Sequence, residues 1–192
     1  MIKDKITPEL KKAFSESIKK TEDSGNEHGF FMCLSKDEKL YASRIKCEGD
    51  NCKINIRLSQ ETCPGKNQGF FHVHPKKLQF EKQIGRKFTE EDKKNIIDTR
   101  GERSTLQMPS HGDVLTMLLT KCNRLTEGTI CTAADLEQDK LECWTLKRGA
   151  ANFATCYYAK RDDILAKDKD MNPKMWIRPL FNKEIIDLKK DP

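Results

Sequence analysis

Residues 70–75 read Phe-Phe-His-Val-His-Pro, and this run limits the structure of the chain more than any other. Side chains two positions apart in a β-strand point to the same face, so His72 and His74 are expected to lie side by side. Pro75 has no backbone N–H and ends the strand, which leaves both imidazoles at the rim of a sheet. This arrangement favours a zinc site, although a His-x-His pair alone also fits an ordinary strand with one buried and one exposed ring.

Two further runs carry polar residues of interest. Glu27 opens a strand-like run that continues Gly-Phe-Phe after His28, and Ser110 and Asp113 lie in the run Pro-Ser-His-Gly-Asp. Taken alone, Ser110 and Asp113 are typical of a helix start, because Ser is a common N-cap and an acidic residue three positions later is close to a capping box. An apolar stripe at helical spacing follows, formed by Val114, Leu115, Leu118, Leu119 and Cys122. These features predict a helix from Ser110 to about Arg124.

Together and in this order, the three runs resemble the JAMM metalloproteases, the catalytically competent branch of the JAB/MPN domain. In that family two His and one Asp bind zinc, and a water molecule fills the fourth position. The resemblance implies that His72, His74 and Asp113 are the ligands of one catalytic Zn²⁺ ion. It also implies that Glu27 accepts a proton from the water and that Ser110 helps to stabilise the tetrahedral intermediate.

The remaining two histidines are not expected to be ligands. If Glu27 faces the metal as a base, its neighbour His28 should point to the opposite face of the strand. His111 would be the first residue of the helix begun by Ser110. At about 100° per residue, it would lie roughly 200° around that helix from Asp113.

The resemblance implies a fold and an activity. We expect an α/β protein with a single JAB/MPN-like domain over residues 1–192, in which helices flank a curved, mixed and mostly antiparallel sheet. We expect a zinc-dependent metallopeptidase or isopeptidase that hydrolyses amide bonds in protein substrates such as ubiquitin-like modifier conjugates. One alternative is an MPN-type scaffold or binding module without turnover. Another is a DNA-repair-associated JAB protein.

The charge pattern bears on the partners. The formal net charge is +6, with acids interspersed among the bases, so nucleic acid is not an expected partner. No apolar run approaches the ~18 residues that a membrane span needs, and a membrane partner is not expected. The N-terminus is charged and lacks an apolar signal region, which indicates a cytoplasmic protein.

The spacing between His74 and Ser110 departs from the family, which usually has a short spacer there. Here 35 residues intervene, and we treat residues 76–109 as an insertion between the metal strand and the following helix. We expect it to be a lid or substrate-contact element beside the site. Its basic residues would then face an acidic patch or a C-terminal tail of the substrate: Lys76, Lys77, Arg86 and Lys87. A solvated surface loop is the alternative for the basic part.

The eight cysteines form no Cys-x-x-Cys pair, and reduced thiols are expected. Cys33, Cys131, Cys143 and Cys156 fall in apolar runs and should behave as small buried hydrophobes. Cys47 and Cys52 flank a turn, so a disulfide or a second metal there is an alternative.

Periodicity and turn residues place the other elements. A helix should begin after the N-cap Thr7 and end at Gly25, and a short helix should begin at Thr89 and run to about Asp98. The expected strands cover 28–35, 39–46, 53–58, 68–74, 129–134, 141–147 and 152–159. A short final helix is expected at 182–189.

Overall fold

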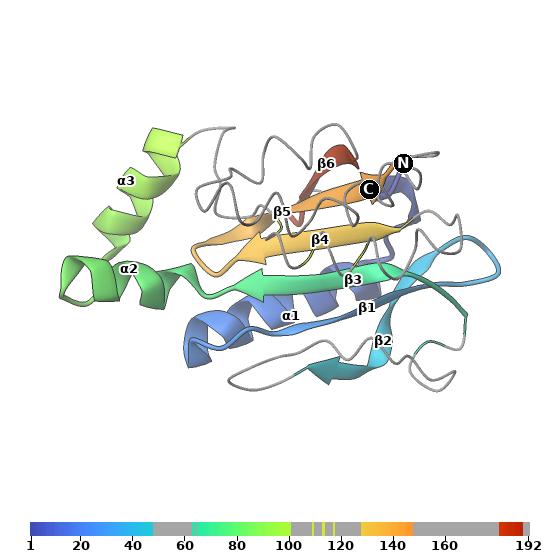
Figure 1. The fold of residues 1–192 in the computed structure, drawn as a ribbon, viewed down its shortest axis with the longest axis horizontal. Helices are drawn as coiled ribbons and strands as arrows, with labels where there is room; N and C mark the ends of the chain where they lie inside the picture. Colours follow the sequence, from blue (N-terminus) through green and yellow to red (C-terminus); the bar gives the residue numbers. More distant parts are fainter. Residues whose placement is uncertain are drawn as a thin grey trace, which may run out of the picture.

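The structure is a computed structural model that describes residues 1–47, 63, 65–100, 109, 113, 117, 128–147 and 181–189. It is an α/β fold whose six-stranded mixed sheet has the order β2-β1-β3-β4-β5-β6 (Figure 1). The strands are β1 (Gly29–Leu34), β2 (Leu40–Cys47), β3 (Lys66–His74), β4 (Thr129–Ala134), β5 (Glu137–Leu146) and β6 (Phe181–Asp187). Only the β3–β4 pair is parallel among these neighbours. No helix in the described parts of the chain has the length and apolar character needed to cross a membrane.

The first long helix, α1 (Pro8–Ser24), follows a 3₁₀ turn at Lys3–Lys5 and forms where the sequence predicts it. The Thr7 hydroxyl accepts a hydrogen bond from the Leu10 N–H, so it caps a helix whose first residue is proline. Gly25 ends the helix with φ at 74°, a left-handed conformation that costs glycine little. Both ends of α1 are therefore set by local residues.

The core lies between α1 and one face of the sheet. Phe14 of α1 contacts Phe30 of β1 and Phe71 of β3, with ring centroids 5.6 and 4.7 Å apart, and all three side chains are buried. Val73 belongs to the same core. The alternation in β3 therefore points Phe71 and Val73 toward α1 and turns His72 and His74 to the other face of the sheet.

The expected final helix at 182–189 is wrong, because these residues form most of β6. Every residue from Phe181 to Asp187 pairs with β5 in antiparallel register. The Lys183 ammonium lies 2.6 Å from the buried carboxylate of Glu142, and Ile186 enters the core. Pairing with an available sheet edge outweighs the helix propensity of the Lys, Glu and Leu residues in this segment.

The expectation of reduced thiols is wrong for four cysteines. Cys33 is bonded to Cys63, and Cys131 is bonded to Cys143, its direct partner on the neighbouring strand. Burial of Cys33, Cys131 and Cys143 agrees with their apolar surroundings, but pairing between distant positions carries no local sequence signal. Disulfides are typical of proteins in oxidising compartments, and the cytoplasmic location expected from the N-terminus stays a prediction. Cys52 and Cys156 lie outside the described residues.

Two helices follow the metal strand and form the described part of the insertion. The second, α3 (Glu90–Arg100), begins as predicted, with reciprocal hydrogen bonds between Thr89 and Asp92. The first, α2 (Lys76–Ile84), occupies a stretch for which no helix was expected. Both helices extend beyond the end of the sheet at which β3 finishes (Figure 1).

The start of α2 is held by a residue from another part of the chain. Its N-cap position is Pro75, which makes no side-chain capping hydrogen bond. Instead the Asp135 carboxylate, in the turn between β4 and β5, accepts from the N–H of Lys76 at 2.8 Å and from that of Lys77 at 3.1 Å. Further along, Phe80 and Phe88 are half-buried and pack against Ala134 and Leu136. The helix is therefore defined by contacts across the fold.

Candidate metal centre

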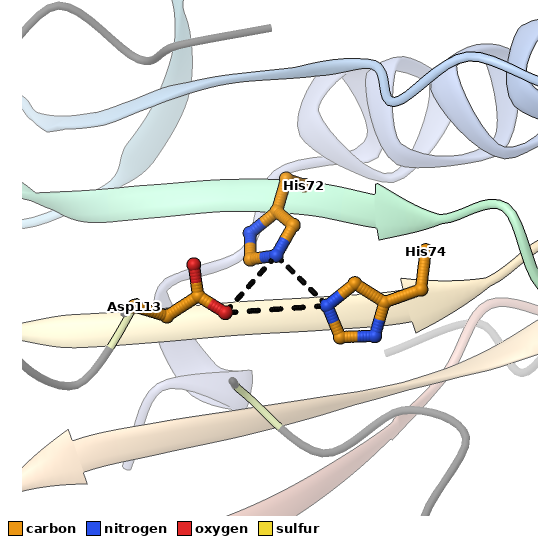
Figure 2. A group of neighbouring side chains, drawn as sticks. All are labelled: His72, His74 and Asp113. Atoms are coloured by element: carbon orange, nitrogen blue, oxygen red, sulfur yellow. Dashed lines mark hydrogen bonds and ion pairs between the residues drawn. The ribbon is translucent and has the colours of Figure 1, made fainter. Parts of the chain in front are cut away.

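Three of the predicted site residues converge on one point. His72 and His74 come from β3, and their Nε2 atoms lie 2.9 Å apart. The Asp113 Oδ2 atom lies 3.3 Å from the first Nε2 and 4.0 Å from the second. Figure 2 shows the three side chains pointing toward one another, with the carboxylate facing both rings. Among the described residues, this is the one group of His, Cys, Asp or Glu whose geometry suits a metal ion.

The separations fit the coordination sphere of a zinc-sized ion. Bonds of about 2.0–2.1 Å at tetrahedral angles place neighbouring ligand atoms about 3.3 Å apart. The three observed separations of 2.9, 3.3 and 4.0 Å bracket this value. Three protein ligands leave the fourth tetrahedral position open, as in catalytic zinc sites and unlike closed structural sites. The residues present therefore fit the ion.

The two histidines are both buried, and their tautomers matter to metal binding. Without an ion, one Nε2 must donate a proton to the other across the 2.9 Å contact. With an ion, both Nε2 atoms would be unprotonated, so the Nδ1 atom of each ring would carry the hydrogen. The Nδ1 atom of His72 is buried and has no hydrogen-bond partner in the structure as described.

Glu27 lies beside this group. Gly29 pairs with His72, and the N–H of Val73 donates to the His28 carbonyl, so continuing the register sets Glu27 opposite His74. The strand alternation then turns Glu27 to the same face of the sheet as the ligands. The charges of His72 and Asp113 both act on its carboxyl group, which agrees with this placement.

The surroundings of Glu27 and His72 raise the pKa values of both side chains. Burial raises the pKa of Glu27; the charge of His72 opposes this shift and that of Asp113 adds to it. Burial alone would lower the pKa of His72, but its hydrogen bond to Asp113 and the charges of Asp113 and Glu27 outweigh burial and raise it. A general base works best when its pKa lies near the working pH, so the shift of Glu27 is in the useful direction.

Gly29 allows β1 to approach the ligand strand closely, and sequence reasoning overlooked it. A Cβ at this position would lie 2.9 Å from the Cβ of His72 and still closer to the carbonyl oxygen of Phe71. A side chain there would separate β1 from β3 and move Glu27 away from His74. The available signal was a Gly two positions after the candidate base, inside an otherwise apolar strand.

The other predicted residues divide into those the structure describes and those it does not. His28 is buried on the α1 side, with its Nδ1 atom 3.2 Å from the Thr21 hydroxyl and 3.0 Å from the Asn26 carbonyl. It therefore points away from the ligands, as the alternation predicted. Asp113 has helical conformation. Ser110 and His111 lie outside the described residues, and their roles remain predictions.

The four basic residues expected to meet substrate have partners within the chain. Lys76 contacts Gln79 at 3.3 Å, and the Lys77 ammonium lies 3.9 Å from Glu22. Arg86 makes two hydrogen bonds to Asp92, at 2.6 and 2.8 Å, and Lys87 lies 3.3 Å from Glu81. Arg86 and Lys87 thus hold the corner between α2 and α3. Their role toward substrate remains a prediction.

Removal of any one ligand should abolish stoichiometric metal binding. We expect His72→Ala, His74→Ala and Asp113→Ala each to bind far less than one zinc ion per chain, because three ligands are the minimum for such a site. His28→Asn is the matched control, because it also removes a buried histidine but leaves the metal face untouched. Metal content after dialysis, measured by mass spectrometry, checks this. Full occupancy in His74→Ala would contradict the assignment.

Metal affinity should depend on pH. A proton on His72 competes with the ion, and the raised pKa extends the protonated form to higher pH than usual. Apparent zinc affinity should therefore rise as pH increases from about 6 to about 8 and then level off above the pKa of His72. Competition with a chromophoric chelator measures it. Constant affinity over this range would argue that His72 is not a ligand.

Comparisons with known proteins identify no relative. No protein-family model matches the chain, and no curated protein or solved structure matches it either. The assignment of function therefore depends on the residues of the site itself.

Proposed function

We propose that the chain is a JAMM-type zinc metallopeptidase with a JAB/MPN-like fold, which hydrolyses amide or isopeptide bonds in ubiquitin-like modifier conjugates. The single observation that carries the proposal is the convergence of the His72, His74 and Asp113 ligand atoms on one point, with Glu27 beside them. The α/β sheet with flanking helices is compatible with this fold.

Each residue of the site would have its own role in the reaction. His72, His74 and Asp113 would hold the ion, and zinc at such a site lowers the pKa of water to about 7. Glu27 would accept the proton of the attacking water and return it to the leaving amine. Its partly buried position supports this role, because burial raises its pKa toward neutrality. Ser110 would donate a hydrogen bond to the developing oxyanion.

Replacement of Glu27 by Gln should separate catalysis from metal binding. We expect zinc content and fold to be retained and hydrolysis of a ubiquitin-like conjugate to fall by about 10²–10⁴-fold, because only proton transfer is lost. Glu38→Gln, at an exposed turn position, is the matched control and should keep full activity. Loss of zinc in Glu27→Gln would make Glu27 a ligand, and wild-type turnover would remove it from the mechanism.

The described part of the insertion follows directly on the ligand strand, which suits it to contact with a protein substrate. Helix α2 begins two residues after the ligand His74, and the insertion ends just before Ser110. Its described side chains include the exposed apolar residues Leu78 and Ile84, at 40% and 44% exposure. Exposed apolar side chains beside a candidate active site are suited to binding a protein partner.

A variant in which a short Gly/Ser linker replaces residues 82–107 tests this role and keeps the first turn of α2. We expect it to bind zinc and to cleave a short peptide as the full chain does, but to cleave a folded protein conjugate at a clearly different rate. Comparison of kcat/KM for the two substrates checks this. Equal rates on the conjugate would exclude the insertion from substrate recognition.

A further inference from the structure

The end of the ligand strand is held by a buried residue that is neither a metal ligand nor a sequence neighbour of His74. Asp135 lies in the turn between β4 and β5 and is 1% exposed. A buried carboxylate is costly unless hydrogen bonds satisfy it, so its partners show what it does in the fold. All of its described hydrogen bonds go to the backbone that follows or includes His74.

Those hydrogen bonds involve three backbone groups around the ligand His74, two of them in the first turn of α2. The Asp135 N–H donates to the His74 carbonyl at 3.2 Å. The Asp135 carboxylate accepts from the Lys76 and Lys77 N–H groups. Pro75, between them, has no N–H to offer. One residue therefore holds the chain on both sides of the point at which β3 ends and α2 begins.

His74 needs such support because it is the last residue of its strand. Strand ends separate easily, and a ligand displaced by about 1 Å no longer fits a metal site. His74 pairs with Ala134 of the parallel strand β4, and Asp135 is the next residue after Ala134. The turn that contains Asp135 therefore begins beside His74. The carboxylate also meets the positive end of the α2 dipole, which strengthens its hold.

We propose that Asp135 is a positioning residue for the metal centre: it fixes the end of β3 and the start of α2 as one unit and so sets the metal affinity of His74. The inference rests on the proposed metal site but not on hydrolysis. Groups that orient metal ligands typically change metal affinity by about 10–100-fold when they are removed. The insertion is tied to the metal centre through the same carboxylate.

The test uses the full chain and zinc, with affinity measured by chelator competition and amide exchange followed at Lys76 and Lys77. We expect Asp135→Ala to bind zinc at least about tenfold more weakly than the wild type, with faster exchange at both amides. Asp135→Asn keeps an acceptor oxygen but loses the charge, so its hydrogen bonds should weaken, and both its zinc affinity and its amide exchange should lie between those of the wild type and Asp135→Ala. Asp92→Ala is the matched control: it removes an aspartate that caps α3, and should leave zinc affinity unchanged.

The outcomes separate this inference from the proposed function. A wild-type chain that takes up no zinc overturns both. Zinc binding by the wild type, with equal affinity in Asp135→Ala, overturns the positioning role alone. If Asp135→Ala does not fold, Asp135→Asn decides: weaker zinc binding with faster exchange at Lys76 and Lys77 supports the inference, and unchanged zinc affinity overturns it.

Discussion

Successive side chains of β3 point to opposite faces of the sheet, and this alternation determines where the core and the candidate metal centre lie. Phe71 and Val73 pack against α1, where the rings of Phe14 and Phe30 complete an aromatic cluster. His72 and His74 must then lie on the opposite face. A shift of β3 by one residue would exchange the two sets, placing the imidazoles in the apolar core and Phe71 and Val73 in the polar site. Core packing therefore fixes the position of the ligands.

Charge balance in the site is a second consequence of this arrangement. Glu27 and Asp113 place two carboxylates near two imidazoles, and burial disfavours the charged forms of Glu27 and His72. The hydrogen bond to Asp113 and the charges of both carboxylates raise the pKa of His72, which favours its positively charged form. A divalent cation carries the charge needed to offset both carboxylates, and it allows both imidazoles to be neutral. The electrostatics of the group are thus better satisfied by a doubly charged ion than by a proton.

The features predicted from sequence are those set by nearby residues. The limits of α1 follow from Thr7 and Gly25, the start of α3 follows from Thr89 and Asp92, and the shared face of the histidines follows from strand geometry. The convergence of Asp113 with these histidines came from resemblance to a family, since no local rule links positions so far apart.

The features that sequence reasoning missed depend on distant partners. Helix α2 lacks a local cap and begins where Asp135 accepts its first N–H groups. The segment at 181–187 has helix-forming residues but finds a sheet edge on β5. The disulfides join residues 30 and 12 positions apart. In each case the deciding interaction is tertiary, and the local pattern either gives no signal or favours a different structure.

The parallel pairing of β3 with β4 has a consequence for folding. Parallel neighbours require a crossover, and here residues 75–128 form the longest connection between described strands in the sheet. Asp113 lies within this crossover, 39 positions after His74. An ion shared by the two residues would close a long loop, as a crosslink does, and reduce the chain entropy that β3–β4 pairing must overcome. The metal centre would then also be the point at which the crossover is fastened to the sheet.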